Sequence, residues 1–449
     1  MIWILVIGLQ LSAFKTFSQK VWSLDDCIAY ALKHNLTQEA QNYNAEISKE
    51  RWLQSKRDML PTIGISYPSY NVSLGRSLDP VTNSFIDTRY VSGLSGGLSS
   101  SITVFESFKK WHALAYSKLL YQSSKFREQQ AEYDLAFKIM GLFNTVLFQE
   151  GALDIIKEQQ AVNFLYQKEI SKKVALELVA KADLYAIEAT ISADALAVLK
   201  AKNALNAAKL ALIQEMNLEA VTINIIQDAP SNLNVSSVPL NIDHLFNTSK
   251  KALPNLQISQ LNIETAKKEL AMSKTARYPS IRFGANMFTS YSDNFKDATG
   301  STIIFKDQIK NNLSKSFGFS LNYALFNNGR TRSSIKIARI QLEKAKTQLE
   351  IEEQRTYKVI QELLQKNEAL IAEKELTQKN IKAKEKAYDI AKRKFEKKLI
   401  NLYELEIASN AYLNTKIEQV RLMAQMAIQK RTLDFYNGTF KLPIKSTSN

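Results

Sequence analysis

The sequence contains few residues that interrupt helices. Glycine occurs 13 times and proline 8 times in 449 residues. Their combined share of the chain is well below the average of about 12% in proteins. A chain so poor in both residue types does not form a turn-rich sandwich or a doubly wound α/β enzyme along its whole length. We therefore predict a mainly α protein that is built of long helices.

Cysteine and histidine are also scarce. Cys27 is the only cysteine, which excludes an intramolecular disulfide and a cysteine-based metal site. The three histidines leave little material for a zinc site or a histidine-based catalytic centre. No nucleophile–base arrangement, phosphate-binding loop or metal-ligand spacing is present either. We expect no enzyme activity, no metal and no cofactor, and we interpret Asp25 and Asp26 as first-turn acids favoured by a helix dipole.

The chain carries a formal net charge of +15. Its basic residues are spread along helical stretches with glutamates between them, which is typical of solvated helix faces. No nucleic-acid-binding motif accompanies them. We therefore expect no nucleic-acid partner.

Long hydrophobic runs are absent except at the start of the chain. Residues 2–14 are apolar, but a helix that spans a bilayer needs about 20 such residues. The length suits the central part of a signal peptide, with cleavage after Ser18, although no basic residue precedes the run. A buried N-terminal helix is the alternative interpretation. On the first interpretation the mature chain is exported and has no transmembrane helix.

The glycines and prolines that do occur are clustered. Most glycines lie in the windows 61–104 and 279–329. The segments that follow have few breakers, and 330–437 has none. A helix of that length does not fit in a globular domain. We predict that 105–217 and 330–437 each fold back as a long antiparallel helical hairpin.

The two halves of the sequence align with each other. Leu24-Asp25 corresponds to Ile242-Asp243, and Val104-Phe105 corresponds to Leu325-Phe326, at nearly the same offset. Self-similarity in one constant order indicates a structural duplication. The expected organisation is a signal peptide (1–18), a first repeat (19–229), a connector (230–240) and a second repeat (241–449).

The glycine-containing windows have the alternation of strands. Apolar and small or polar residues alternate, most clearly from Phe317 to Leu325, and we predict strands at about 62–75, 90–104, 280–291 and 316–326. The polar segments 76–89 and 292–315 are expected to be loops. Period two alone favours a half-buried sheet of a soluble protein over a barrel strand with one lipid-facing side. The expected export and the very long helices around the four strands favour the barrel instead. Four strands cannot close a barrel, so a membrane barrel would need several chains.

These features together resemble the TolC family of outer-membrane efflux proteins. The resemblance rests on the duplicated order of helices and strands, on the segment 23–32 (SLDDCIAYAL), on Pro61 and Pro279 at helix ends, and on 325–330 (LFNNGR). It implies a homotrimer with a twelve-stranded barrel in the outer membrane and an α-helical tunnel in the periplasm. It also implies a passive exit duct that docks to a periplasmic adaptor and to an inner-membrane transporter.

Three groups of site residues follow from the repeats and the resemblance. The lipid-facing barrel residues are expected to be Tyr67, Phe283, Phe317, Phe319, Leu321 and Tyr323. The adaptor-docking hairpin tips are expected at Glu177, Lys181, Asp183, Lys398, Asn401 and Glu404. The tunnel constriction is expected at Asp389, Lys392 and Arg393. The family usually has glycine where Glu177 and Lys398 stand, and these two residues are a departure from its pattern.

A periplasmic coiled-coil adaptor or scaffold is the competing function. Residues 402–433 carry a seam with alternating steps of three and four, which is typical of coiled coils and does not require a tunnel. The four strands with aromatic faces argue against an adaptor. An enzyme is the least favoured class.

Overall fold

The computed structural model describes residues 21–78, 82–226 and 241–443. The expected signal peptide (1–18) and connector (230–240) lie outside these residues. The chain forms two compact units. The first, here called the helical unit, comprises 1–42, 128–254 and 353–449, and the second, the sheet unit, comprises 43–127 and 255–352.

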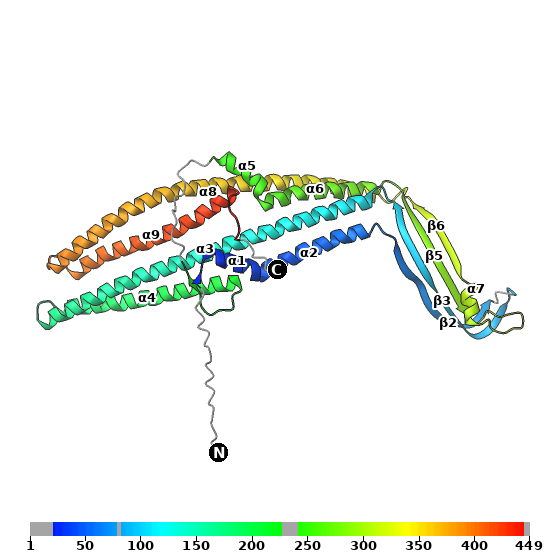
Figure 1. The fold of residues 1–449 in the computed structure, drawn as a ribbon, viewed down its shortest axis with the longest axis horizontal. Helices are drawn as coiled ribbons and strands as arrows, with labels where there is room; N and C mark the ends of the chain where they lie inside the picture. The colour runs from blue at the N-terminus through cyan, green and yellow to red at the C-terminus, as the bar shows by residue number, and fades with distance from the viewer. Residues whose placement is uncertain (1–20, 79–81, 227–240, 444–449) are drawn as a thin grey trace, which may run out of the picture. The chain divides into compact units, whose positions relative to one another are not determined.

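The described residues are mainly helical, as predicted (Figure 1). The helices are α1 (Leu24–His34), α2 (Leu36–Arg57), α3 (Lys109–Ala175), α4 (Lys181–Met216), α5 (Ile242–Ala252), α6 (Pro254–Thr275), α7 (Phe305–Asn311), α8 (Arg330–Glu396) and α9 (Leu402–Tyr436). The strands are β1 (Val21–Trp22), β2 (Thr62–Leu78), β3 (Phe85–Phe105), β4 (Asn224–Ile225), β5 (Ser280–Ser292) and β6 (Ser314–Asn322).

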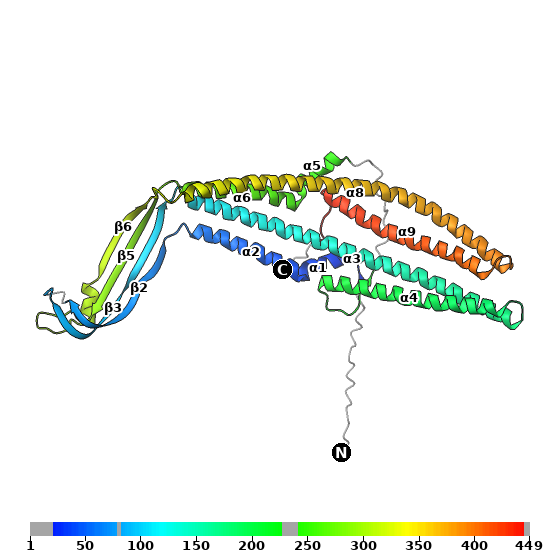
Figure 2. The ribbon, with the colours of Figure 1, turned by 180° about the vertical axis from the view of Figure 1, so that it is seen from behind.

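Corresponding helices of the two halves have matching lengths. The helices α1 and α5 have 11 residues each, α2 and α6 have 22 each, and α3 and α8 have 67 each. The hairpins close with α4 (36 residues) and α9 (35 residues). Figures 1 and 2 show each long helix folding back into its partner. The predicted duplication and the two helical hairpins are confirmed.

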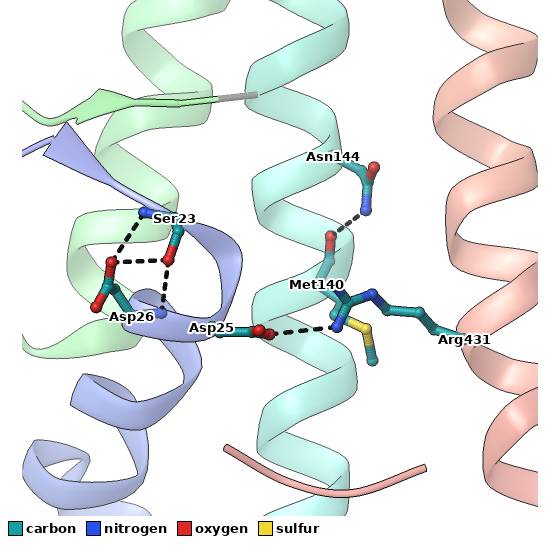
Figure 3. A network of polar contacts seen from close by, with 6 residues as sticks. All are labelled: Ser23, Asp25, Asp26, Met140, Asn144 and Arg431. Atoms are coloured by element: carbon teal, nitrogen blue, oxygen red, sulfur yellow. Dashed lines mark hydrogen bonds and ion pairs between the residues drawn. The ribbon is translucent and has the colours of Figure 1, made fainter. Parts of the chain in front are cut away.

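The first helix begins with a complete capping box. The Ser23 side chain accepts a hydrogen bond from the backbone N–H of Asp26 at 3.1 Å, and the Asp26 carboxylate accepts from the backbone N–H of Ser23 at 3.3 Å. Asp25, also in the first turn, forms an ion pair with Arg431 of α9 at 3.3 Å (Figure 3). These acids therefore stabilise a helix start, as the sequence predicts.

The main core of the helical unit lies between α1, α3 and α4. Its fully buried side chains include Ile28, Ile139, Met140, Leu212 and Met216, and Cys27 is buried in it as well. Within the described residues, α3 alone is long and apolar enough over 18 residues to cross a membrane by composition. A core helix satisfies the same criterion, and this one supplies much of the core.

Three expected segments differ from the structure. The strand predicted at 316–326 is β6, which ends at Asn322. Asn322 pairs with Ser280, the first residue of β5, so the chain beyond it has no ladder partner among the described residues. The expected loop 292–315 contains the helix α7. The expected loop 76–89 is shorter than predicted, because β2 ends at Leu78 and β3 begins at Phe85.

Candidate functional site: sheet faces and hairpin turns

The sheet unit contains four antiparallel strands in the order β2-β3-β5-β6. Residues that lie directly opposite one another on neighbouring strands point to the same face. One such row is formed by Ile65, Leu98, Met287 and Lys315. The next row on this face is Ile63, Ser100, Ala285 and Phe317. The register therefore gathers the apolar side chains of all four strands on one face, here called the apolar face.

Most of the predicted barrel residues lie on the apolar face. Phe283 is opposite Phe319, and their rings are 5.1 Å apart. Phe317, Phe319 and Leu321 are 82%, 71% and 68% exposed in the single chain, which is unusual for such large apolar side chains.

The remaining two barrel residues stand apart from this group. Tyr67 lies in β2, and its side chain is not among those described. Tyr323 lies just beyond the end of β6, so it is not a strand residue, in contrast to the prediction.

The opposite face of the sheet carries small and hydroxyl side chains. On β3 it presents Gly97, Ser99 and Ser101, and on β6 it presents Ser316, Gly318 and Ser320. We call this surface the hydroxyl face. A sheet with one apolar and one polar face is typical of a transmembrane β-barrel. It is also typical of a soluble protein whose sheet has one buried face. The exposure of the apolar face favours the first.

The β5 edge is capped where β6 no longer accompanies it. The pairing of β5 with β6 ends at Phe288. Beyond it, the amide of Gln308 in α7 bonds to both backbone groups of Ser292, at 2.9 and 2.8 Å. The Asn312 amide donates to the Ser290 carbonyl at 2.8 Å. Gln308 is only 2% exposed, so these side chains replace the missing ladder and protect an open edge.

Both hairpin turns have the same backbone geometry. At the first, the N–H of Glu177 donates to the Val174 carbonyl at 3.0 Å, and the N–H of Leu178 donates to the Lys173 carbonyl at 2.8 Å. This bond pattern is a Schellman motif, whose central residue adopts a left-handed conformation. Glu177 has φ 55°, in the region where glycine is preferred.

The second turn repeats this motif in the second half of the chain. The N–H groups of Lys398 and Leu399 donate to the carbonyls of Phe395 and Lys394, both at 2.9 Å. Lys398 has φ 60°. The two positions that depart from the family's glycine are therefore the two residues in which the turns need a left-handed backbone.

The helices after the turns start differently. Asn401 caps α9, because its side chain accepts a hydrogen bond from the backbone N–H of Glu404 at 2.9 Å. In the first repeat, Lys181 opens α4 and Asp183 lies in the first turn, but Ala180 at the cap position makes no side-chain bond. The second turn is thus the better fixed of the two.

The predicted constriction residues lie on one exposed flank of α8. Asp389, Lys392 and Arg393 are all exposed. The neighbouring positions Tyr388 and Phe395 instead pack into a small apolar cluster that joins the two hairpins near their turns. Because a helix has 3.6 residues per turn, Asp389 and Arg393 lie about 100° or more from Tyr388 around the helix axis. Lys392 follows Tyr388 by four residues and lies beside the edge of the cluster.

This cluster links residues that are far apart in the sequence. It contains Tyr166, Ile170 and Ile187 of the first hairpin and Leu402 and Leu405 of the second. Burial is the main cause that raises the pKa of Tyr166 above its ordinary value, and Tyr388 adds to it. The hydroxyl of Tyr166 is therefore neutral at physiological pH.

Two polar contacts also join the hairpins. Lys416 of α9 forms an ion pair with Glu158 of α3 at 2.6 Å, and Thr190 of α4 donates to the carboxylate of Glu406. Neither contact was predicted, because single charged or hydroxyl residues on a helical surface carry no signal for a partner more than 200 residues away. The same holds for Gln308, whose polar side chain gives no sign of burial.

Comparison with protein-family models gives a match to the second repeat. Residues 245–439, from α5 to the end of α9, match the model of the outer membrane efflux protein. This repeat is therefore similar to an outer membrane efflux protein domain. The resemblance to TolC-family proteins and the outer-membrane location are thereby confirmed. No curated protein sequence matches the chain.

Solved channel structures share the fold of nearly the whole chain. The outer membrane protein VceC of Vibrio cholerae is similar with a TM-score of 0.75 and 14% identity, over 92% of this chain and 96% of that one. The CmeC outer membrane channel of Campylobacter jejuni is similar with a TM-score of 0.76 and 15% identity, over 95% and 87%. The open state of the MtrE outer membrane channel of Neisseria gonorrhoeae is similar with a TM-score of 0.73 and 16% identity, over 95% and 91%. The chain therefore has a TolC-like fold.

Proposed function

We propose that the chain is one subunit of an outer-membrane channel that serves as the exit duct of a tripartite efflux pump or a type I secretion system. The observation that supports this most directly is the pair of sheet faces. Lipid would cover the apolar face, and water in the lumen would solvate the hydroxyl face. A soluble sheet would leave large aromatic side chains such as Phe317 and Phe319 in water.

The edges of the sheet support a homotrimer. Within the described residues, β2 and β6 have a neighbour on one side only. Unpaired backbone groups are not tolerated in the hydrocarbon region of a bilayer. Three copies can pair each β6 with the β2 of the next copy, which closes a barrel of twelve strands and removes every edge.

The helical hairpins are proposed to form the periplasmic tunnel. Each 67-residue helix extends about 100 Å along its own axis. The tunnel supplies no energy of its own in this proposal, so an inner-membrane transporter and a periplasmic adaptor would drive export. The turns around Glu177 and Lys398 are the proposed docking points for that adaptor, and Asp389 with its basic neighbours is the proposed constriction.

Fractionation and crosslinking test the channel against the alternative of a periplasmic scaffold. A cysteine on each edge strand, for example Asn71→Cys in β2 and Ser320→Cys in β6, should crosslink three subunits of the outer-membrane fraction in detergent. Several pairs of positions along the two strands are tested, because the register between copies is set by assembly. A chain recovered as a soluble periplasmic monomer, with no crosslinked trimer for any pair, would favour the scaffold.

A further inference from the structure

Charge is almost absent from the hydroxyl face. The paired segments that build it are 62–66 and 69–73 of β2, 91–103 of β3, 280–292 of β5 and 314–322 of β6. Glycine, serine, threonine and asparagine supply most of its side chains. Among these described segments, Arg282 of β5 is the one ionisable residue on this face.

The position of Arg282 follows from the register. It lies opposite Thr103 of β3 and opposite Ser320 of β6. Both neighbours are on the hydroxyl face, both are uncharged, and the Arg282 side chain is exposed. Since Arg282 is the third residue of β5, which follows α6, it lies at the end of the strand where the helices meet the sheet.

The other charged residues of the sheet are placed differently. Lys315 lies opposite Met287 on the apolar face. Arg76 and Asp87 form an ion pair at 2.9 Å in the part of β2 and β3 beyond β5, so their charges cancel. The guanidinium of Arg282 is therefore the uncompensated charge of the surface that would face the lumen.

We propose that Arg282, contributed by each of three subunits, forms a cationic belt at the helix-side end of the barrel lumen and makes the lumen select for anionic over cationic solutes. This inference rests on the proposed trimeric channel. The wall beyond the belt would consist mainly of glycines and of neutral hydroxyl and amide side chains, with Phe288 opposite Gly97. These uncharged groups discriminate little between anions and cations. Net charge selection within the barrel is then assigned to this single position.

The size of the effect follows from screened electrostatics. Three charges about 10 Å from the axis should enrich anions over cations roughly fourfold at 0.1 M salt, because the Debye length there is also about 10 Å. The enrichment should grow several-fold at about 0.01 M salt, where the Debye length reaches about 30 Å. A belt that acts through space thus has a steep dependence on ionic strength.

Reversal potentials in planar bilayers test the belt. The purified full chain is reconstituted, and a KCl gradient is applied to the parent, Arg282→Gln, Arg282→Glu and Arg282→Lys. The chloride-to-potassium permeability ratio should fall roughly two- to fourfold in Arg282→Gln and further in Arg282→Glu. It should be retained in Arg282→Lys. Lys315→Gln removes an equal charge from the other face and should leave the ratio unchanged.

A second arm changes the charge after folding. Arg282→Cys in a Cys27→Ser background is inserted and then treated with a cationic or an anionic methanethiosulfonate. The cationic reagent should restore the parental ratio, and the anionic reagent should lower it. Open channels whose selectivity is the same for the parent, Arg282→Gln and both modified forms would overturn the belt alone. Failure of the parent to form any channel would instead count against the proposed function.

Discussion

Gly97 lies where two strands of the sheet approach closely. A Cβ atom at this position would lie 2.0 Å from the Met287 carbonyl oxygen and 2.9 Å from the Cα of Phe288. Since both are backbone atoms, no rotamer change can relieve the contact. Gly97→Ala should therefore separate β3 from β5 and destabilise the sheet by roughly 1–3 kcal/mol.

The measurement is the yield and thermal stability of the purified trimer in detergent. Gly64→Ala is the matched control, because Gly64 lies on β2 and a Cβ there meets no atom within 4 Å. Equal stability of the two variants would show that the backbones of β3 and β5 are not in this close contact.

Glu177 and Lys398 hold left-handed conformations that a side chain disfavours. Such a conformation costs an L-residue about 1–2 kcal/mol. Substitution by glycine removes this cost, but part of the gain is lost because glycine has more conformational freedom in the unfolded chain. Glu177→Gly and Lys398→Gly should each stabilise their turn by up to about 1 kcal/mol. Hydrogen exchange of the turn amides should slow accordingly.

The control for this prediction keeps the Cβ atom. Glu177→Ala removes the charge but not the steric cause of the strain, so its exchange rates should remain near those of the parent. If the alanine variant gains as much protection as the glycine variant, charge rather than backbone conformation limits the stability of the turn.

Asp389 is one acid among several basic residues on an exposed flank of α8. If this flank lines the proposed constriction, Asp389→Ala should raise single-channel conductance and shift selectivity toward anions, because it removes an acid from a flank that also carries Lys392 and Arg393. Glu375→Ala is the control, because Glu375 pairs with Lys379 on the same helix at 2.6 Å. Parental conductance and selectivity in Asp389→Ala would remove this residue from the constriction.

At the scale of the element, β6 distinguishes a membrane strand from a soluble one. Phe319 lies on the apolar face and Ser320, the next residue, on the hydroxyl face. Phe319→Arg should hinder assembly in the outer membrane, since a charge facing lipid costs about 2–4 kcal/mol at mid-bilayer. Ser316→Arg, opposite the uncharged Asn286 on the hydroxyl face, carries the same side chain into the lumen and should be tolerated.

The amount of assembled trimer in the outer-membrane fraction measures this difference. Equal assembly of both variants would show that neither face of the sheet contacts lipid. Leu321→Arg and Asn322→Arg repeat the comparison one step along the strand and exclude an effect that is specific to Phe319.

The α7 helix is an element that could not be predicted from its local sequence. Nothing in the polar segment 292–315 indicated a helix, because seven residues give too little periodicity to detect. The helix is held in place by tertiary contacts, in particular the buried Gln308 amide on the β5 edge. Strand alternation, in contrast, is a local pattern, and it predicted β5 closely.

At the scale of the whole molecule, the two turns should contact the same partner. They occupy equivalent positions in the repeats and share one backbone motif. Cysteines at Lys181 and Asn401, in a Cys27→Ser background, should crosslink in cells to the adaptor when a bifunctional maleimide is added. Glu343→Cys on α8 is the control and should capture no adaptor. Capture at Glu343 alone would mean that the docking surface is assigned to the wrong part of the chain.

Four features could be predicted from the amino-acid sequence: the helical content, the two hairpins, the duplication and the faces of the strands. Each depends on local information: the scarcity of glycine and proline, the period of the apolar residues, or the similarity of the two halves. Each of these patterns can be read along the chain without knowing which distant residues come into contact.

Four other features required the folded chain: the register, the edge cap on β5, the contacts between the hairpins and the isolation of Arg282 on the hydroxyl face. Each of these depends on which distant residues become neighbours. Alternation already assigns Arg282 and Lys315 to opposite faces of their strands, but only the ladder shows that uncharged residues, Thr103 and Ser320, lie opposite Arg282. Long-range pairing is set by the packing of the whole chain, and a change of register by one residue would have exchanged the two faces.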